Sequence, residues 1–192
     1  HLDIAVDPVE GTTFLAGGQT NAMAVIATAP KGTMLDPGPA FYMEKFAAPA
    51  ETKGKIDMNW STEKKLKTVA SLIEKDLKDL TVFVLDKPRH RGLVEEIHAA
   101  GARVTLYPAG DVAGAIMAAI PDTEVDVLMG TGGTPEGIIS ACAIRAMGGE
   151  FLGRINPQLA TEIVSVRDAG FDTDRWYERD ELIGSDDVHF CA

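Results

Sequence analysis

The sequence predicts an α/β fold built as layered sheets and helices, with largely parallel strand–helix alternation across residues 81–147. Two observations support this prediction. Short apolar runs alternate with amphipathic segments, and a Gly or Pro closes each amphipathic segment. We expect strands at 81–85, 103–107 and 125–129, separated by helices at 90–100, 111–119 and 135–147. The short connections favour parallel pairing, which places ligands beyond the carboxyl ends of the strands.

Further elements are expected in the first 80 residues. Apolar runs predict strands at 2–6 and 22–27, and the segment 41–43 is expected to be a strand or an extended loop. Either Ser61 or Thr62 is predicted to cap a helix. The apolar positions of this helix recur at intervals of three and four, at Leu66, Val69, Ala70, Ile73 and Leu77.

Composition and charge exclude several classes of partner. The 192 residues are 45% hydrophobic, which is enough for one substantial core. With 18 basic and 29 acidic residues the net charge is -11, so we expect neither nucleic acid nor a membrane as a partner. A small anionic substrate then requires a local basic pocket or a metal. No long apolar run or signal segment is present, and we expect a cytoplasmic location.

Cysteine and histidine residues predict no metal centre of their own. Cys142 and Cys191 form no C-x-x-C pair, so neither a disulfide framework nor a zinc site is expected. The four histidines are scattered without metal-binding spacing.

An acidic hexapeptide, DPVEGT, occupies residues 7–12 directly after the first apolar run. Asp7 and Glu10 can converge if the backbone turns sharply between them, and Pro8 favours such a turn. Two carboxylates and the Thr12 hydroxyl would then surround one point, which suits a divalent metal held against a phosphate. The alternative is an acidic turn that caps a helix.

A glycine-rich octapeptide, GTGGTPEG, occupies residues 130–137 and is expected to follow a strand end. Its glycines let the backbone approach a ligand closely, and Thr134 before Pro135 predicts an N-cap with free amides that face an anion. Glu136 in the first helical turn could complete a metal site. The motif matches neither a nucleotide P-loop nor a dinucleotide fingerprint. The alternative is a flexible turn before a well-capped helix.

A basic turn, KPRH, lies at residues 87–90 between these motifs. Lys87 and Arg89 follow a predicted strand end, where Arg suits bidentate phosphate recognition and Lys acts as a point charge. The alternative is a solvated basic turn. Asp111 could contact a ligand or serve as the N-cap of the following helix.

Together these motifs resemble class II fructose-1,6-bisphosphatase, within the lithium-sensitive, metal-dependent sugar and inositol phosphatase superfamily. The resemblance runs over essentially the whole chain but matches only the middle of the family's sequence. It implies a sandwich of the sugar phosphatase type and a central fragment at 1–192. Within that fragment we expect a metal and phosphate part at 1–60 and an α/β substrate-binding part at 61–192.

The resemblance implies roles for individual residues. Asp7, Glu10 and Glu136 would bind Mg²⁺ or Mn²⁺, and Asp7, Glu10 and Thr12 would be catalytic, with Thr12 near the attacking water and the scissile phosphate. Substrate-binding positions would be Gly11, Thr12, Tyr42, Lys87, Arg89, Gly110, Asp111 and Gly133. The chain has Ala109 where the family usually carries the first Asp of Asp-Gly-Asp, which affects the preferred sugar.

The implied function is metal-dependent hydrolysis of the 1-phosphate of fructose 1,6-bisphosphate in gluconeogenesis, by a homo-oligomer. Two enzymatic alternatives are hydrolysis of sedoheptulose 1,7-bisphosphate and of an inositol phosphate. A different class is a non-catalytic module that binds a sugar phosphate. A further alternative is that the glycine-rich segment is purely architectural.

Overall fold

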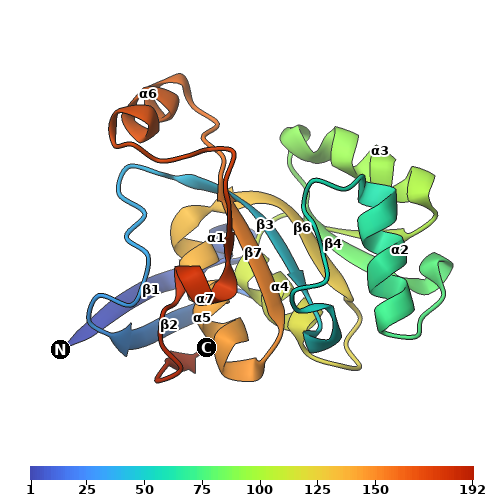
Figure 1. The fold of residues 1–192 in the computed structure, drawn as a ribbon, viewed down its shortest axis with the longest axis horizontal. Helices are drawn as coiled ribbons and strands as arrows, with labels where there is room; N and C mark the ends of the chain where they lie inside the picture. The colour runs from blue at the N-terminus through green and yellow to red at the C-terminus, as the bar shows by residue number, and fades with distance from the viewer.

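The computed structural model describes residues 1–192 and contains two sheets with helices between and outside them (Figure 1). The strands are β1 (Leu2–Glu10), β2 (Met23–Pro30), β3 (Tyr42–Ala48), β4 (Thr81–Leu85), β5 (Arg103–Tyr107), β6 (Val127–Gly133), β7 (Glu150–Ile155), β8 (Trp176–Glu178) and β9 (His189–Cys191). The α-helices are α1 (Thr12–Ala16), α2 (Thr62–Leu72), α3 (Arg91–Ala100), α4 (Asp111–Ala119), α5 (Thr134–Met147), α6 (Ala160–Asp168) and α7 (Arg179–Leu182). Short 3₁₀ turns cover Ala50–Thr52, Leu77–Asp79 and Pro88–His90.

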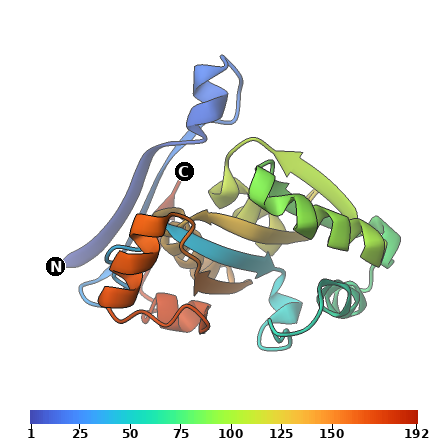
Figure 2. The ribbon, with the colours of Figure 1, turned by 90° about the horizontal axis from the view of Figure 1, so that it is seen from above.

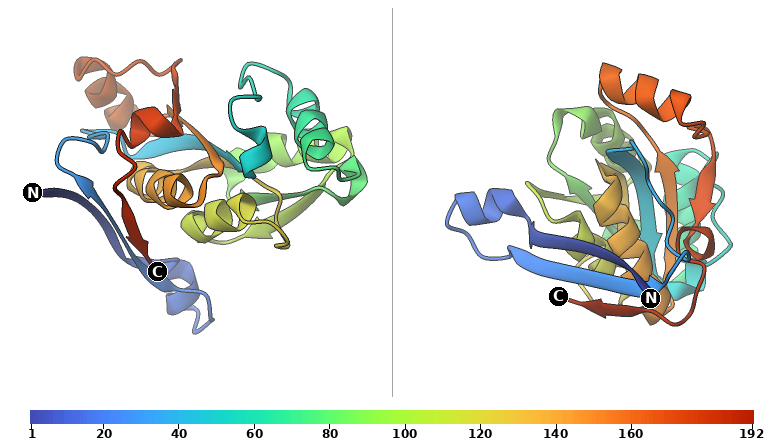
Figure 3. Two further views of the ribbon diagram at one scale, coloured as in Figure 1. Left: turned by 60° about the horizontal axis from the view of Figure 1, so that its bottom comes forward. Right: turned by 90° about the vertical axis from the view of Figure 1, so that its left-hand side faces the viewer.

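The layers alternate sheet, helices, sheet, helices. A three-stranded sheet, β1-β2-β9, packs on α5, and α4 and α5 pack on the six-stranded sheet, whose order is β5-β4-β6-β3-β7-β8. Helices α2 and α3 cover the opposite face of that sheet. Both chain ends lie at the small sheet, where β1, β2 and β9 run side by side (Figure 3). The predicted α/β fold class is therefore confirmed.

Two apolar cores hold the layers together. The larger core joins α4 and α5 to both sheets and includes Val25, Met43, Phe83 and Ile139. The second core packs α2 and α3 against the six-stranded sheet through residues such as Phe46 and Leu66. The β1–α1–β2 segment projects from this body (Figure 2). No helix is both long enough and apolar enough to cross a membrane.

Parallel pairing is confirmed for the alternating part of the chain. Strand β4 pairs in parallel with β5 and with β6. The rest of the six-stranded sheet is antiparallel, because β3 pairs antiparallel with β6 and β7, and β7 pairs antiparallel with β8. The carboxyl ends of β4, β5 and β6 therefore meet at one edge, as the alternation predicts.

Helix α2 begins as predicted but ends early. The Ser61 hydroxyl caps it by accepting a hydrogen bond from the Lys64 amide at 3.2 Å. The helix ends at Leu72, because Glu74 adopts a left-handed backbone with φ 54°. Leu77, which the apolar pattern assigned to this helix, lies instead in the next 3₁₀ turn.

Strand β3 is longer and more central than the prediction of a short strand or loop at 41–43. It pairs on both sides and is buried over most of its length. The charged pair Glu44 and Lys45 interrupts its apolar pattern, which explains why the sequence indicated only its beginning.

Strand β1 corrects the predicted turn after residue 6. The strand continues to Glu10 and carries a bulge, in which Pro8 and Val9 lie opposite the single residue Ala24. In a regular strand, residues 7 and 10 would point to opposite faces. The extra residue of the bulge returns Asp7 and Glu10 to the same face, so convergence arises without a turn.

The glycine-rich segment is also corrected. Residues 130–133 are the end of β6 and pair with β3, so they are not a turn beyond the strand. Gly133 is the N-cap of α5 and Thr134 is its first residue. The expected free amides are partly occupied, because the Thr134 amide donates to the Phe41 carbonyl at 2.8 Å and the Thr131 amide donates to His90 at 2.8 Å.

Candidate metal and phosphate site

Three carboxylates from distant parts of the chain meet at one point. Asp7, Glu10 and Glu136 each offer an oxygen, and the three oxygens lie within 4.8 Å of one another. The bulge in β1 turns the first two carboxylates to the same side, and the first turn of α5 supplies the third. The sequence-based grouping of these three residues therefore matches their positions in space.

Two glycines at the end of β6 make room for this cluster. A Cβ atom at Gly133 would lie 1.8 Å from Glu136 Oε2, and one at Gly132 would lie 1.9 Å from Asp111 Oδ2. A methyl group at either position would therefore displace a carboxylate of α4 or α5, although neither glycine has a positive φ.

Two buried side-chain oxygens in the first turn of α5 lack protein partners. Glu136 Oε2 and Thr134 Oγ1 are both buried, and neither has a hydrogen-bond partner. A buried polar atom without a partner is costly, so its position indicates a ligand. Carboxylate and hydroxyl oxygens are hard donors that suit Mg²⁺ or Mn²⁺, and the residues therefore fit a divalent cation.

Burial and nearby carboxyl groups both favour the protonated form of Glu10. Burial raises the pKa of Glu10 to about 7, with smaller contributions from the charge of Asp111, a hydrogen bond with Asp7 and the charge of Glu136. The Val112 amide opposes the shift by donating to Glu10 Oε1 at 3.1 Å. A cation at this point would favour the ionised form of Glu10 and so oppose the effects of burial and of the neighbouring carboxyl groups.

A buried lysine pairs with Asp111 beside the cluster. Lys45 is only 1% exposed, and its Nζ lies 2.5 Å from Asp111 Oδ2. Asp111 is the first residue of α4 and makes no capping hydrogen bond, so the alternative that it caps this helix is wrong. Lys45 was not predicted from the sequence, where its only signal is a charge inside an apolar strand.

The first residues after β1 lie next to Glu10. Gly11 adopts a left-handed backbone with φ 79°, and a Cβ there would approach the Phe14 ring to 2.9 Å. Thr12 follows as the exposed first residue of α1. Phe14 also lies near Gly110, the left-handed N-cap of α4, so its ring lies between the α1 and α4 starts.

The basic turn lies at the carboxyl end of β4, as predicted. Arg89 donates through Nε and Nη2 to the Thr131 carbonyl at 3.0 and 2.6 Å, and its guanidinium lies 5.4 Å from the Tyr42 ring centre. Tyr42 pairs with Gly133 across β3 and β6. Lys87 is half-buried in the same turn. Arg89, Tyr42 and Gly133 are therefore neighbours around the end of β6.

A buried carboxylate that the sequence did not indicate fixes the start of β3. Glu162 Oε1 accepts hydrogen bonds from the Phe41 and Tyr42 amides at 2.7 and 2.8 Å. Its other oxygen accepts from the Gln158 amide at 2.8 Å at the start of α6. No local sequence pattern distinguishes this Glu from a surface residue.

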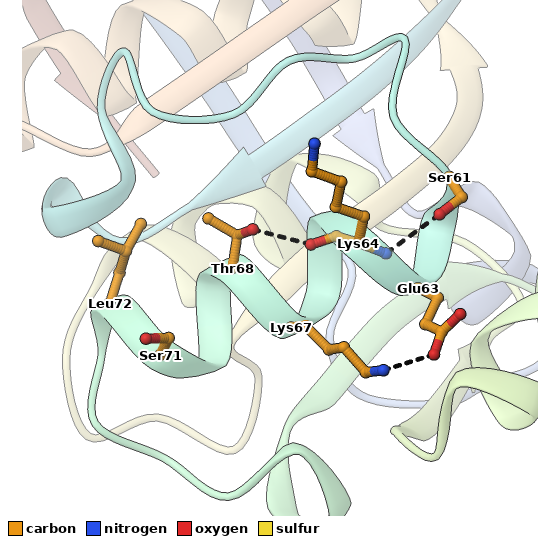
Figure 4. A pocket seen from close by; sticks show the side chains of 7 residues that line it. All are labelled: Ser61, Glu63, Lys64, Lys67, Thr68, Ser71 and Leu72. Atoms are coloured by element: carbon orange, nitrogen blue, oxygen red, sulfur yellow. Dashed lines mark hydrogen bonds and ion pairs between the residues drawn. The ribbon is translucent and has the colours of Figure 1, made fainter.

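A separate hollow lies along the outer face of α2 (Figure 4). It is lined by Ser61, Glu63, Lys64, Lys67, Thr68, Ser71 and Leu72. Its polar groups bond within the helix, as in the Lys67–Glu63 pair at 2.5 Å, and none of the predicted site residues lines it. This is a solvated helix face.

Comparison with known proteins identifies the family. A family model described as bacterial fructose-1,6-bisphosphatase, glpX-encoded, matches residues 1–192. The chain belongs to this family. The resemblance inferred from the three sequence motifs is thereby confirmed.

Curated relatives of the family match the whole chain. A fructose-1,6-bisphosphatase class 2 from Haemophilus influenzae is 44% identical over 191 residues. Proteins named D-fructose 1,6-bisphosphatase class 2/sedoheptulose 1,7-bisphosphatase from Crocosphaera subtropica and Synechococcus elongatus are 42% and 41% identical over 205 residues. Each comparison covers 100% of this chain but only 54% to 59% of the relative, so the chain spans little more than half their length.

The close approach at Gly133 predicts that Gly133→Ala weakens metal binding without unfolding the chain. The backbone there, at φ -66° and ψ 140°, is open to alanine, but the new methyl group must displace Glu136. We expect Mn²⁺ affinity to fall by about 10-fold or more, as for other changes that disturb ligand position. Calorimetry measures this effect. Gly92→Ala is the matched control, since a Cβ there meets open space, and equal affinities in the two variants would contradict the prediction.

The raised pKa of Glu10 predicts a pH-dependent effect of Glu10→Gln in the metal-free chain. The pKa lies above its ordinary value of 4.5, so the stability due to the bound proton is complete below pH 4.5 and is lost as the pH rises through about 7. Gln stays neutral, and we expect it to raise the free energy of unfolding by about 1 to 3 kcal/mol at pH 8 and scarcely at pH 5. Denaturant titration with a chelator present tests this; an equal effect at both pH values would refute it.

Proposed function

We propose that the protein carrying this chain hydrolyses the 1-phosphate of fructose 1,6-bisphosphate with the help of Mg²⁺ or Mn²⁺. One observation carries the proposal. The chain belongs to the fructose-1,6-bisphosphatase family, and the oxygens of Asp7, Glu10 and Glu136 converge to within 4.8 Å of one another. They lie beside the glycine end of β6, the residues Gly130, Gly132 and Gly133. The chain covers about half the length of its relatives, so further ligands and substrate contacts can come from sequence outside residues 1–192.

In this proposal, Asp7, Glu10 and Glu136 hold the cation. A bound divalent cation supplies Lewis-acid stabilisation of phosphoryl oxygens and lowers the pKa of a coordinated water. Glu10 must give up its proton before it can act as a ligand, because burial and neighbouring carboxylates raise its pKa to about 7. The unpartnered Glu136 Oε2 supports its assignment as a ligand.

Thr12 and Gly11 are proposed to bind the scissile phosphate. They follow Glu10 directly, and the left-handed conformation of Gly11 reverses the chain into α1. We propose that their backbone amides face the phosphate and that the Thr12 hydroxyl lies near the attacking water. The exposure of Thr12 leaves its hydroxyl accessible to a substrate.

The rest of the substrate is proposed to contact Tyr42, Lys87, Arg89 and three residues near the cluster, Gly110, Asp111 and Gly133. The net charge of -11 repels an anionic sugar bisphosphate, and the basic turn supplies local positive charge that attracts it. Arg89 is already oriented by the Thr131 carbonyl, so less freedom is lost when it binds a phosphate. Asp111, held by Lys45, is a candidate acceptor for a sugar hydroxyl.

Hydrolysis of sedoheptulose 1,7-bisphosphate is the second candidate. The relatives from Crocosphaera subtropica and Synechococcus elongatus carry names with both activities. Comparing kcat/KM for the two bisphosphates decides between them, and a ratio near one would assign both activities to this protein.

We also propose that the protein works in the cytoplasm as a homo-oligomer. Leu2, Ile4 and Val6 on β1 are each more than half exposed. This apolar face is available for contact with other chain segments or with a second copy.

The proposed metal ligands predict a specific loss of activity. Asp7→Asn or Glu136→Gln removes one negative oxygen without changing side-chain size, so the fold is retained. We expect kcat for metal-dependent phosphate release from fructose 1,6-bisphosphate to fall by roughly 100-fold or more, the effect of losing one charge-stabilising group. Release of inorganic phosphate by the protein containing residues 1–192 measures it.

A matched control is Glu95→Gln, an exposed residue on α3 that should retain full activity. Unchanged turnover in Asp7→Asn and Glu136→Gln would contradict the proposal. Mn²⁺ binding without hydrolysis in the unaltered protein would instead support the non-catalytic sugar-phosphate module.

A further inference from the structure

His90 is the one buried histidine, and the proposed chemistry does not use it. It ends the basic turn, is 4% exposed, and precedes α3 directly. Its ring lies between the end of β4 and the glycine end of β6, where both ring nitrogens have backbone partners.

The two hydrogen bonds of His90 define one tautomer. A carbonyl can only accept, so Nδ1 carries the proton and donates to the Leu85 carbonyl at 2.7 Å. Nε2 must then be unprotonated, because it accepts from the Thr131 amide at 2.8 Å. Burial, with the charge of Arg89 nearby, lowers the pKa of His90, so the ring stays neutral and able to accept.

Gly130 leaves room for the His90 ring beside the Thr131 amide. A Cβ atom at Gly130 would lie 2.9 Å from His90 Nε2, and Gly130 has a φ of 128° that other residues rarely adopt. The glycine therefore permits both the backbone path of β6 and the approach of the imidazole.

The peptide groups on the two sides of Thr131 connect His90 to Arg89. His90 accepts from the Thr131 amide, while Arg89 donates twice to the Thr131 carbonyl. Arg89 and His90, two consecutive residues of the basic turn, thus bond the carbonyl and the amide of Thr131 in β6. The direction of the Thr131 carbonyl sets the position of the Arg89 guanidinium. The hydrogen bond from the Thr131 amide to His90 helps to fix the backbone at Thr131, and so the direction of that carbonyl.

We infer that His90 is a positioning residue for substrate binding, which fixes the Thr131 segment and through it the phosphate-binding orientation of Arg89. The inference rests on the proposed function, since it assigns Arg89 to the sugar bisphosphate. It assigns no contact between His90 and substrate, and it leaves the metal cluster of Asp7, Glu10 and Glu136 unaffected.

The test uses substitutions of His90 that retain different members of its two hydrogen bonds, to Leu85 and to Thr131. His90→Phe keeps a ring but loses both hydrogen bonds. His90→Asn keeps a donor near Nδ1 but offers no acceptor at Nε2, whereas His90→Gln can offer an acceptor near Nε2. His98→Gln, at an exposed histidine of α3, is the matched control.

We expect the KM for fructose 1,6-bisphosphate to rise by about 10-fold in His90→Phe and His90→Asn, with a much smaller change in kcat. His90→Gln should recover part of the affinity, and His98→Gln should match the parent. Mn²⁺ affinity, measured by calorimetry, should be the same in all variants. This pattern separates substrate positioning from a general loss of structure, which would lower the melting temperature and leave the KM of the folded fraction unchanged.

The outcomes distinguish the two proposals. If the parent protein hydrolyses the bisphosphate and KM is unchanged in His90→Phe and His90→Asn, the role of His90 is wrong and the proposed function stands. If the parent binds fructose 1,6-bisphosphate by calorimetry without turnover, the proposed hydrolysis is wrong, and weaker binding in His90→Phe still supports the positioning role. If the parent neither binds nor hydrolyses it, both are overturned.

Discussion

The candidate site depends on the absence of side chains at the end of β6. Carboxylate oxygens of Asp111 and Glu136 lie within 2 Å of where Cβ atoms of Gly132 and Gly133 would be. Backbone and carboxylates can therefore approach much more closely than in an ordinary strand-to-helix connection. Glu136, whose Oε2 has no protein partner, occupies this open space and offers an oxygen within 4.8 Å of the carboxylates of Asp7 and Glu10. The same two glycines therefore affect both the local packing and the geometry of the proposed metal site.

Of the carboxyl groups at the candidate metal site, only Asp111 is paired with a basic side chain. Burial, and then the neighbouring carboxyl groups of Asp111, Asp7 and Glu136, raise the pKa of Glu10, whereas Lys45 is the buried cation that contacts Asp111. Lys45 and Asp111 form a buried ion pair, and removing either partner would leave a buried charge without its counter-ion. The carboxyl groups of Asp7, Glu10 and Glu136 have no such basic partner. A divalent cation at the proposed site would supply positive charge there, and it would compete with the proton for Glu10.

The sequence indicated much of the site, because its contributors carry strong local patterns. Asp7, Glu10 and the segment around Glu136 belong to two short motifs, and the strand–helix alternation predicts that ligands gather at the strand ends. The route to convergence was not predictable, since a bulge depends on how β1 pairs with β2. Lys45 and His90 were missed as structural partners for a similar reason: their contacts, to Asp111 and Thr131, come from distant parts of the chain. A local pattern carries no information about such partners.

In the proposed site, one divalent cation is shared by carboxylates from β1 and from the start of α5. Anomalous diffraction from crystals grown with Mn²⁺ tests it most directly. A shared cation would give a manganese peak bonded to oxygens of Asp7, Glu10 and Glu136 at about 2 to 2.3 Å, the range for hard cations with oxygen ligands. A manganese peak elsewhere, with the Glu136 carboxylate turned away from β1, would contradict it.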